Sequence, residues 1–201
     1  MDAAAWDERY RASDLVWSAG PNQFVEAELA GLPPGRALDL AAGEGRNAIW
    51  LARRGWRVTA VDFSQAGLDK GRTLAEGLDV DWVCADATTW ASDPAYDVCL
   101  VAYLQLVAAE RRAAVRNAYD SLRRHGTLLW VSHDLSNLSE GVGGPSDPAV
   151  LMTAEDVVGD LEGRSFDVEH AGRVARLVPD GHGEEPEATA WDCVVRLVRR
   201  D

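Results

Sequence analysis

Residues 37–47 (ALDLAAGEGRN) join a buried apolar strand to a helix through a loop that contains two glycines one residue apart. Gly43 and Gly45 carry no Cβ, so the backbone of this loop can approach a ligand closely. The N-terminus of the following helix would then face that ligand. Glycine pairs also occur in plain tight turns, and this loop alone is therefore a weak indication of a ligand site.

Acidic residues follow the next two predicted strands. Asp62 in VDFS stands 17 residues after Gly45, and its carboxylate can accept hydrogen bonds from both hydroxyls of a ribose, although an aspartate there can also cap a helix. Asp86 in CADA offers an acceptor for an exocyclic amine such as that of adenine. Asp39 and Glu44 add negative charge to the glycine loop, which disfavours a pyrophosphate and favours a nucleoside with cationic sulfonium and ammonium groups.

Strand-like apolar runs alternate with amphipathic segments of helical length from residue 36 onward. This alternation predicts a parallel sheet covered by helices. The carboxyl ends of such strands share one edge, so we expect the glycine loop and the later acidic residues to lie together. The predicted strands are 36–41, 56–61, 80–85, 96–102 and 127–133, and the predicted helices are 47–54, a segment running from a Ser64 cap towards Gly77, and 108–124.

The pattern changes after the fifth predicted strand. Residues 134–152 are rich in Gly, Ser, Asn and Pro and predict a long loop, a kind that is often functional or mobile. Thr153 then provides a capping residue for a short helix. Two strand-like runs follow, FDVEHAGRVARLV and ATAWDCVVRLVRR, joined only by PDGHGEEPE. So short a connection cannot easily hold a helical crossover, which predicts an antiparallel hairpin.

Composition narrows the classes of protein. The 201 residues, 47% of them hydrophobic, predict one globular domain over 1–201, and no run approaches the ~18 apolar residues that cross a bilayer. The N-terminus has no secretory signal, so a cytoplasmic location without a membrane partner is expected. A net charge of −13 opposes binding to nucleic acid and favours a small-molecule partner. The three cysteines lack zinc-site spacing and are expected to be buried free thiols.

Several of these stretches together resemble the class I S-adenosylmethionine-dependent methyltransferases over nearly the whole chain. They are LDLAAGEGRN, VDFS, CADA, YDVCLVAYLQ and GTLLW. The stretch GEGRNAIWLARRGWRVTAVDFS and the N-terminal WDERY are most similar to the small-molecule branch that contains the tellurite-resistance and thiopurine-type enzymes. The resemblance implies an α/β, Rossmann-like, doubly wound seven-stranded sheet in the order 3-2-1-4-5-7-6 with strand 7 antiparallel, in agreement with the predicted hairpin.

The resemblance also implies a site for S-adenosylmethionine. Its residues would be Asp39, Ala41, Gly43, Gly45 and Asn47 for the methionine part, Asp62 for the ribose, Phe63, Asp86 and Ala87 for the adenine, and Ala102 with Tyr103 beside the sulfonium. Ala41 departs from the family pattern, in which many relatives have glycine, so the backbone angles available to that residue are restricted.

The acceptor side is less defined. His133 stands where the fifth strand meets the long loop and is a candidate general base, although it could simply bond a backbone group. Tyr103 is a second candidate catalytic residue, and Tyr10, Trp17, Gln105 and Asp134 are candidate substrate residues. Residues 1–30 are expected to form a cap over the cofactor, and residues 134–152 a loop on the substrate side. His182 neighbours three glutamates, but a solvated acidic loop is the preferred interpretation, and no metal is expected.

The expected activity is in-line methyl transfer from S-adenosylmethionine to a small-molecule acceptor, with S-adenosylhomocysteine as product. Alignment and desolvation can supply most of the acceleration, so a dedicated base is optional. Three alternatives stay open: a nucleoside-binding protein without turnover, an NAD-dependent oxidoreductase and a nucleic-acid methyltransferase. Ala41 in place of the first NAD-loop glycine disfavours the second, and charge disfavours the third. The sequence leaves the acceptor atom and the oligomeric state undetermined.

Overall fold

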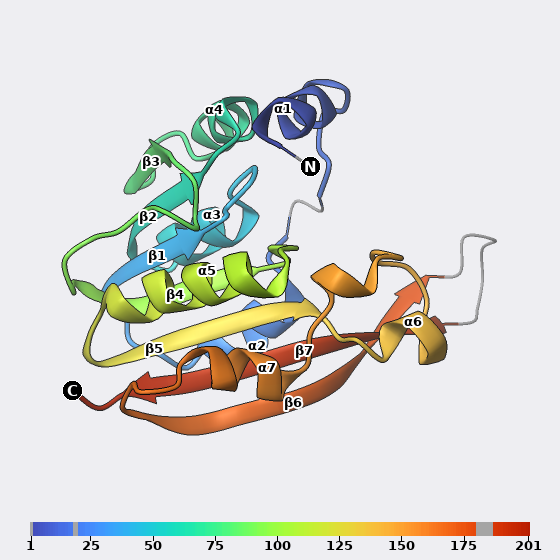
Figure 1. Ribbon diagram of the computed structural model, residues 1–201. Coiled ribbons are helices and arrows are strands. Elements are labelled where there is room, and N and C mark those ends of the chain that lie inside the picture. Colours follow the sequence, from blue (N-terminus) through green and yellow to red (C-terminus); the bar gives the residue numbers. More distant parts are fainter. Residues whose placement is uncertain (1, 18–19, 180–186) are drawn as a thin grey trace.

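A seven-stranded sheet with the strand order β3-β2-β1-β4-β5-β7-β6 runs through the protein. The computed structural model describes residues 2–17, 20–179 and 187–201 (Figure 1). The strands are β1 (Arg36–Leu40), β2 (Arg57–Asp62), β3 (Val80–Cys84), β4 (Tyr96–Ala102), β5 (Leu122–His133), β6 (Phe166–Pro179) and β7 (Glu187–Arg199). β1 to β5 pair in parallel, whereas β7 pairs antiparallel with both β5 and β6. The predicted strand order and the predicted hairpin are confirmed.

Helices cover both faces of this sheet (Figure 1). They are α1 (Ala3–Arg11), α2 (Gln23–Leu29), α3 (Arg46–Arg53), α4 (Gln65–Leu74), α5 (Ala108–Asp120), α6 (Asn137–Glu140) and α7 (Ala154–Asp160), with the 3-10 helix η1 at Pro148–Val150. Apolar residues of α5 and α7 form one buried cluster with the sheet, and those of α2 and α3 form a second on the opposite face. The sheet is therefore buried between two helical layers, as a doubly wound fold requires.

Two predicted helix starts have the expected caps. The Ser64 hydroxyl accepts a hydrogen bond from the Gly67 N–H at 3.2 Å and begins α4. Thr153 begins α7 with a capping box, in which its hydroxyl accepts from the Asp156 N–H and the Asp156 carboxylate accepts from the Thr153 N–H. These caps satisfy N–H groups that a helix start leaves unpaired.

Three local predictions were wrong. Helix α5 ends at Asp120 rather than 124 because Leu122 is already paired with Tyr96 at the start of β5, ahead of a register shift. Residues 134–152 hold α6 and η1 rather than loop alone. Cys84 is exposed, whereas Cys99 and Cys193 are the buried free thiols that were expected. Within the described ranges, no helix is long and apolar enough to cross a membrane.

Candidate active site

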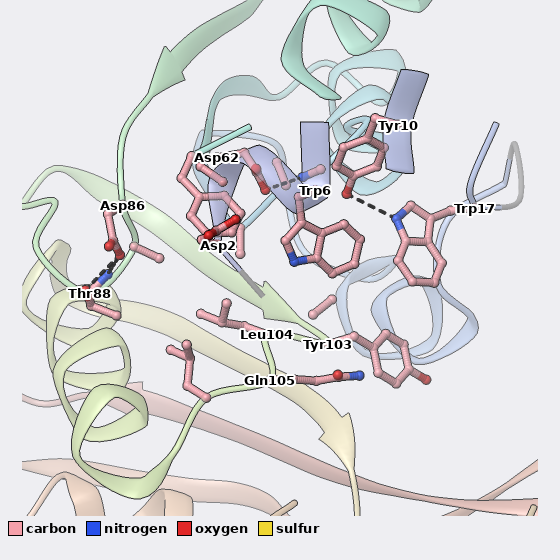
Figure 2. A pocket seen from close by; sticks show the side chains of 18 of the residues that line it. Asp2, Trp6, Tyr10, Trp17, Asp62, Asp86, Thr88, Tyr103, Leu104 and Gln105 are labelled. Carbon is pink, nitrogen blue, oxygen red and sulfur yellow. Dashed lines mark hydrogen bonds between the residues drawn. The ribbon is translucent and has the colours of Figure 1, made fainter. Parts of the chain in front are cut away.

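A cavity of about 580 Å³ opens at the carboxyl ends of β1, β2 and β4, beneath α1 (Figure 2). Its lining contains every residue predicted to bind the cofactor except Asp39 and Gly45. The lining residues are Asp2, Ala3, Trp6, Tyr10, Trp17, Ala41, Ala42, Gly43, Arg46, Asn47, Asp62, Phe63, Asp86, Ala87, Thr88, Ala102, Tyr103, Leu104, Gln105, Leu106 and Glu110. The cavity thus lies where ligands bind in doubly wound folds.

The glycine loop turns sharply because Ala41, Gly43 and Gly45 adopt left-handed backbone angles, with φ of 66°, 57° and 73°. Gly43 donates its N–H to Asp62 Oδ2 at 2.8 Å, which ties the loop to the end of β2. A Cβ on Gly43 would lie 2.5 Å from the Tyr10 hydroxyl, so this glycine lets the cap approach the loop. Ala41 holds its left-handed conformation at a steric cost that glycine would avoid.

Gly45 serves packing rather than the cavity. A Cβ at this position would overlap the indole of Trp82, which extends from β3 under the loop. Gly45 is absent from the cavity lining, and its lack of a side chain admits the tryptophan of a neighbouring strand. Its expected place at the methionine part of the cofactor stays a prediction.

Asp39 lies beneath the loop instead of lining the cavity, with 1% of its surface exposed. Oδ2 accepts the Ala48 N–H at 3.0 Å, whereas Oδ1 has no hydrogen-bond partner among the described residues. Burial raises the pKa of this carboxyl to about 7, with the Asp62 charge acting in the same direction. An unpaired buried carboxylate oxygen is costly, and a ligand ammonium group is a chemically suitable partner for it.

Asp62 and Asp86 have different surroundings at the ends of neighbouring strands. Asp62 is buried, and its two oxygens accept the N–H groups of Gly43 and Ser64, each at 2.8 Å. Burial raises the pKa of Asp62 in spite of these bonds. Asp86 is exposed, and Oδ1 accepts from the backbone and hydroxyl of Thr88. Each carboxylate oxygen has two lone pairs, so both aspartates can accept further hydrogen bonds from a ligand.

Aromatic residues of the cap cover the other side of the cavity. Trp6 and Tyr10 on α1 stack with ring centroids 5.4 Å apart, and the Trp17 Nε1–H donates to the Tyr10 hydroxyl at 3.4 Å. Figure 2 shows these three rings facing Leu104 and Tyr103 across the cavity. Burial raises the pKa of Tyr10, so its phenol stays protonated. Residues 2–17 of the predicted cap therefore contribute a wall of the site.

Two carboxylates, one in the cap and one in the glycine loop, attach the cap to the rest of the domain, a role that the sequence did not predict for either. Asp7 Oδ1 accepts from the Ser64 hydroxyl at 2.5 Å and from the Ala66 N–H at 3.1 Å. Glu44 is buried and accepts hydrogen bonds from the backbone N–H groups of Val16 and Trp17, at 3.0 and 3.2 Å. It also forms an ion pair with Lys70. Glu44 was expected to add negative charge at the ligand, but its carboxylate is directed to the cap.

Arg46 is a lining residue that sequence reasoning missed. It begins α3 directly after the glycine loop, and this position beside Asn47 was the signal available. Its guanidinium carbon lies 5.8 Å from the Trp17 ring centroid, and burial lowers its pKa. Asn47 beside it is buried, and its Oδ1 accepts the Asn22 N–H at 2.9 Å.

The predicted acceptor residues divide into two groups. Tyr10, Trp17, Tyr103 and Gln105 line the cavity, whereas His133 and Asp134 do not. The Asp134 carboxylate accepts from the N–H and hydroxyl of Ser136 and stabilises its own turn. The walls of the cavity include no residue of 134–152. The placement of this segment on the substrate side stays a prediction.

No cluster of metal ligands occurs in the part of the chain that the structure describes. His182, considered above as a member of an acidic loop, lies outside the described residues.

Residues 37–126, which contain the glycine loop and both acidic strand ends, match the family described as methyltransferase domain. This stretch of the chain is therefore similar in sequence to a methyltransferase domain. The chain is 38% identical over 119 residues to a demethylmenaquinone methyltransferase of Clavibacter sepedonicus, a match that covers 58% of this chain and 47% of that relative. The chain thus spans about half the length of the curated relatives it matches.

Solved structures match nearly the whole chain in fold. The N-methyltransferase NodS from Bradyrhizobium japonicum WM9, in complex with S-adenosyl-L-homocysteine, has a TM-score of 0.75 at 16% identity, covering 99% of this chain and 98% of that chain. TehB from Haemophilus influenzae has a TM-score of 0.73 at 14% identity, covering 99% and 67%. The class I methyltransferase fold that the sequence predicted is confirmed.

Proposed function

We propose that the protein transfers a methyl group from S-adenosylmethionine to a small-molecule acceptor. The observation that carries this proposal is the meeting of three features at one sheet edge. They are the left-handed glycine loop, the buried Asp39 with its unpaired Oδ1, and Asp62 at the end of β2. A methyltransferase domain over the same residues supports it.

The residues present fit this cofactor. Asp39 would accept the ammonium group of the methionine part, because its Oδ1 lacks a partner among the described residues and a cation relieves that cost. Asp62 would hold the ribose hydroxyls, and Phe63 with Asp86 would hold the adenine. Ala41, Gly43 and Asn47 line the methionine end, with Ala87 on the adenine side and Ala102 beside the sulfonium.

The bound cofactor would supply an electrophilic methyl group on its sulfonium. The chain's own residues align the reactants and exclude water, since in-line displacement from so good a leaving group depends mainly on orientation and desolvation. Trp6, Tyr10 and Trp17 cover the cavity, and the attachments through Asp7 and Glu44 hold that cover in place. Tyr103 forms the wall opposite the cap.

The acceptor belongs to the same proposal. Soft or easily ionised acceptors, such as thiols, chalcogen oxyanions and phenols, need little help from a base. The aromatic walls favour small apolar or planar molecules, which the exposed Gln105 amide could orient at the rim.

We also propose a cytoplasmic location, supported by three cysteines that are all free thiols, as expected in a reducing compartment.

Calorimetric titration tests the cofactor assignment. S-adenosylmethionine and S-adenosylhomocysteine should bind, and NADH should not. Replacing Asp62 by alanine should abolish binding. The matched control is Asp97→Ala, since Asp97 also accepts a backbone N–H, that of Arg36, but at the opposite end of the sheet. Lack of binding by both sulfur nucleosides would refute the proposal.

Turnover separates an enzyme from a nucleoside-binding protein. The protein and S-adenosylmethionine should be incubated with a panel of thiols, tellurite and selenite, and phenols, and S-adenosylhomocysteine should be quantified by chromatography. Formation of that product above the no-acceptor control supports catalysis. Tight cofactor binding with no product from any acceptor class supports the binding-protein alternative.

A further inference from the structure

A cluster of polar side chains connects the cavity wall at Tyr103 to residues outside the lining. It consists of Tyr103 after β4, which lines the cavity, and of His133 at the end of β5, Arg176 on β6 and Asp192 on β7, which do not. Asp192 has no exposed surface, and it is the cross-strand partner of His133 in the β5–β7 ladder. Three side chains from separate strands and their ends thus surround one buried carboxylate.

Each neighbour of Asp192 faces a particular oxygen. Tyr103 donates its hydroxyl to Oδ2 at 3.0 Å, and Arg176 donates its Nε–H to the same oxygen at 2.6 Å. His133 Nδ1 lies 3.2 Å from the other oxygen, Oδ1. This last contact is not aligned as a hydrogen bond, so His133 Nδ1 and Asp192 Oδ1 both lack a hydrogen-bond partner among the described residues. A small rotation of the imidazole would satisfy both atoms at once.

Asp192 is negatively charged at neutral pH. Burial alone raises its pKa, but the nearby imidazole of His133 and the guanidinium of Arg176 outweigh burial and lower it. An ionised carboxylate can only accept hydrogen bonds, so the groups that face it must be donors. Burial, together with the Asp192 charge, raises the pKa of Tyr103 to about 12, so its phenol keeps the proton that it donates.

Tyr103 is held in a strained position by this cluster. Its φ of 59° is left-handed, which a bulky residue adopts only when its surroundings enforce it. The Tyr103 N–H donates to the Val131 carbonyl at 2.8 Å, and the hydroxyl at the other end is held by Asp192. The His133 ring packs against the Tyr103 ring with centroids 4.8 Å apart.

The loop 134–152 reaches the same cluster from its outer side. Asn137 donates to the Gly143 carbonyl at 2.7 Å and accepts the Trp191 N–H at 2.8 Å, which fixes the loop to β7 beside Asp192. Gly144 then packs on the His133 ring, where an added Cβ would lie 3.1 Å from Nδ1. The loop therefore contacts the cavity wall indirectly, through His133 and Tyr103.

We propose that Asp192 is a positioning residue of the acceptor side, an inference that rests on the proposed function. Its Oδ2 holds the Tyr103 hydroxyl, so that Tyr103 acts as a fixed wall of the cavity and not as a proton acceptor. Its Oδ1 holds His133 in the Nδ1–H tautomer, which leaves the lone pair on Nε2. Of the two candidate catalytic residues, His133 is then the one whose neutral form can accept a proton.

The tautomer of His133 tests this proposal without any acceptor. The full chain is labelled with ¹⁵N-histidine, and long-range ¹H–¹⁵N correlation spectra are recorded at a pH where the histidines are neutral. Loss of one signal set in His133→Gln assigns the residue. We expect the wild-type protein to show the Nδ1–H form, and the opposite tautomer, Nε2–H, would overturn the proposal.

Three variants sharpen the test. In Asp192→Asn, the asparagine oxygen can still accept the hydrogen bonds of Arg176 and Tyr103, and the new amide NH₂ faces His133. Because that NH₂ is a donor, it needs a lone pair on Nδ1, so the tautomer of His133 should switch to Nε2–H. Tyr103→Phe should leave the tautomer unchanged, as should the control Tyr96→Phe, which loses a comparable hydroxyl bond to Thr59 elsewhere on β4. An unchanged His133 tautomer in a folded Asp192→Asn protein also overturns the proposal. If that variant does not fold, the wild-type and Tyr103→Phe spectra still decide it.

Calorimetry on the wild-type protein keeps this inference separate from the proposed function. Failure of S-adenosylhomocysteine to bind refutes the methyltransferase assignment whatever the tautomer. Binding of S-adenosylhomocysteine together with an Nε2–H signal for His133 refutes only the role of Asp192.

Discussion

Asp39 makes the free protein less stable as the pH rises, and its replacement by asparagine should remove that effect. Asp39 is fully buried, and its pKa rises from an ordinary 3.8 to about 7. That difference corresponds to about 4 kcal/mol between the two protonation states. The folded chain retains a proton that the unfolded chain releases. The contribution is therefore fully favourable below the unfolded pKa and is lost progressively as the pH rises through about 7.

The asparagine variant should behave differently because its amide does not titrate. The amide oxygen can still accept the Ala48 N–H that Asp39 binds. Between about pH 5 and pH 8, the free energy of unfolding of Asp39→Asn should therefore rise by about 3 kcal/mol relative to wild type. Urea denaturation followed by circular dichroism at the two pH values measures this difference. Asp81→Asn, on an exposed residue of β3, reports the effect of removing one carboxylate elsewhere.

The same carboxyl should govern cofactor affinity. If Asp39 must ionise to accept an ammonium group, S-adenosylhomocysteine should bind more tightly as the pH rises towards 7, by at most about tenfold per pH unit. Asp39→Asn should bind weakly at every pH. A stability difference between Asp39→Asn and wild type that is the same at both pH values would falsify the assignment of a raised pKa to Asp39.

Further predictions concern the loop and its cap. Ala41→Gly should raise the melting temperature, because relief of a left-handed alanine is worth about 1–2 kcal/mol and the entropy of glycine opposes it by about 0.5–1 kcal/mol; an unchanged or lower melting temperature contradicts this. Gly45→Ala should destabilise by more than about 2 kcal/mol in urea denaturation, because the Cβ meets Trp82, whereas Gly77→Ala, also at positive φ but in open space, should lose only about 1–2 kcal/mol. Equal losses would argue against the Trp82 contact. Glu44→Gln should increase hydrogen exchange at the residue 16 and 17 amides, which it binds, and cost about 1–3 kcal/mol of stability; unchanged exchange there would show that another group holds the cap.

Much of the site could be predicted because its parts are local in sequence. The turn from β1 into α3 needs small residues at fixed positions, and the acids at Asp62 and Asp86 stand directly after strands whose apolar character is plain. Parallel strands place these ends at a common edge, so the residues meet without any further information. The terminal hairpin could be predicted for the same reason, since a short connection leaves an antiparallel return as the simple outcome.

Other assignments failed because a residue type does not reveal which way its side chain points. Glu44 and Asp39 are both acids of the glycine loop, yet one binds the cap and the other lies beneath the loop. The packing role of Gly45 was also missed, because Trp82, which occupies the space of an added Cβ, is 37 positions away in the sequence. Predicting these contacts requires the packing of several strands at once.

The sequence by itself determined the fold class, the sheet order through its family resemblance, and the sheet edge at which the glycine loop and the acidic strand ends meet, because periodicity, glycine positions and strand ends are properties of short segments. The tertiary structure alone decided which polar groups have hydrogen-bond partners within the protein and which do not. Tyr103 and Asp192 are separated by 89 residues, and only the β5–β7–β6 pairing brings the hydroxyl, the carboxylate and Arg176 together. Burial and neighbouring polar groups together then set the charge of each group, and both depend on residues that no local pattern contains.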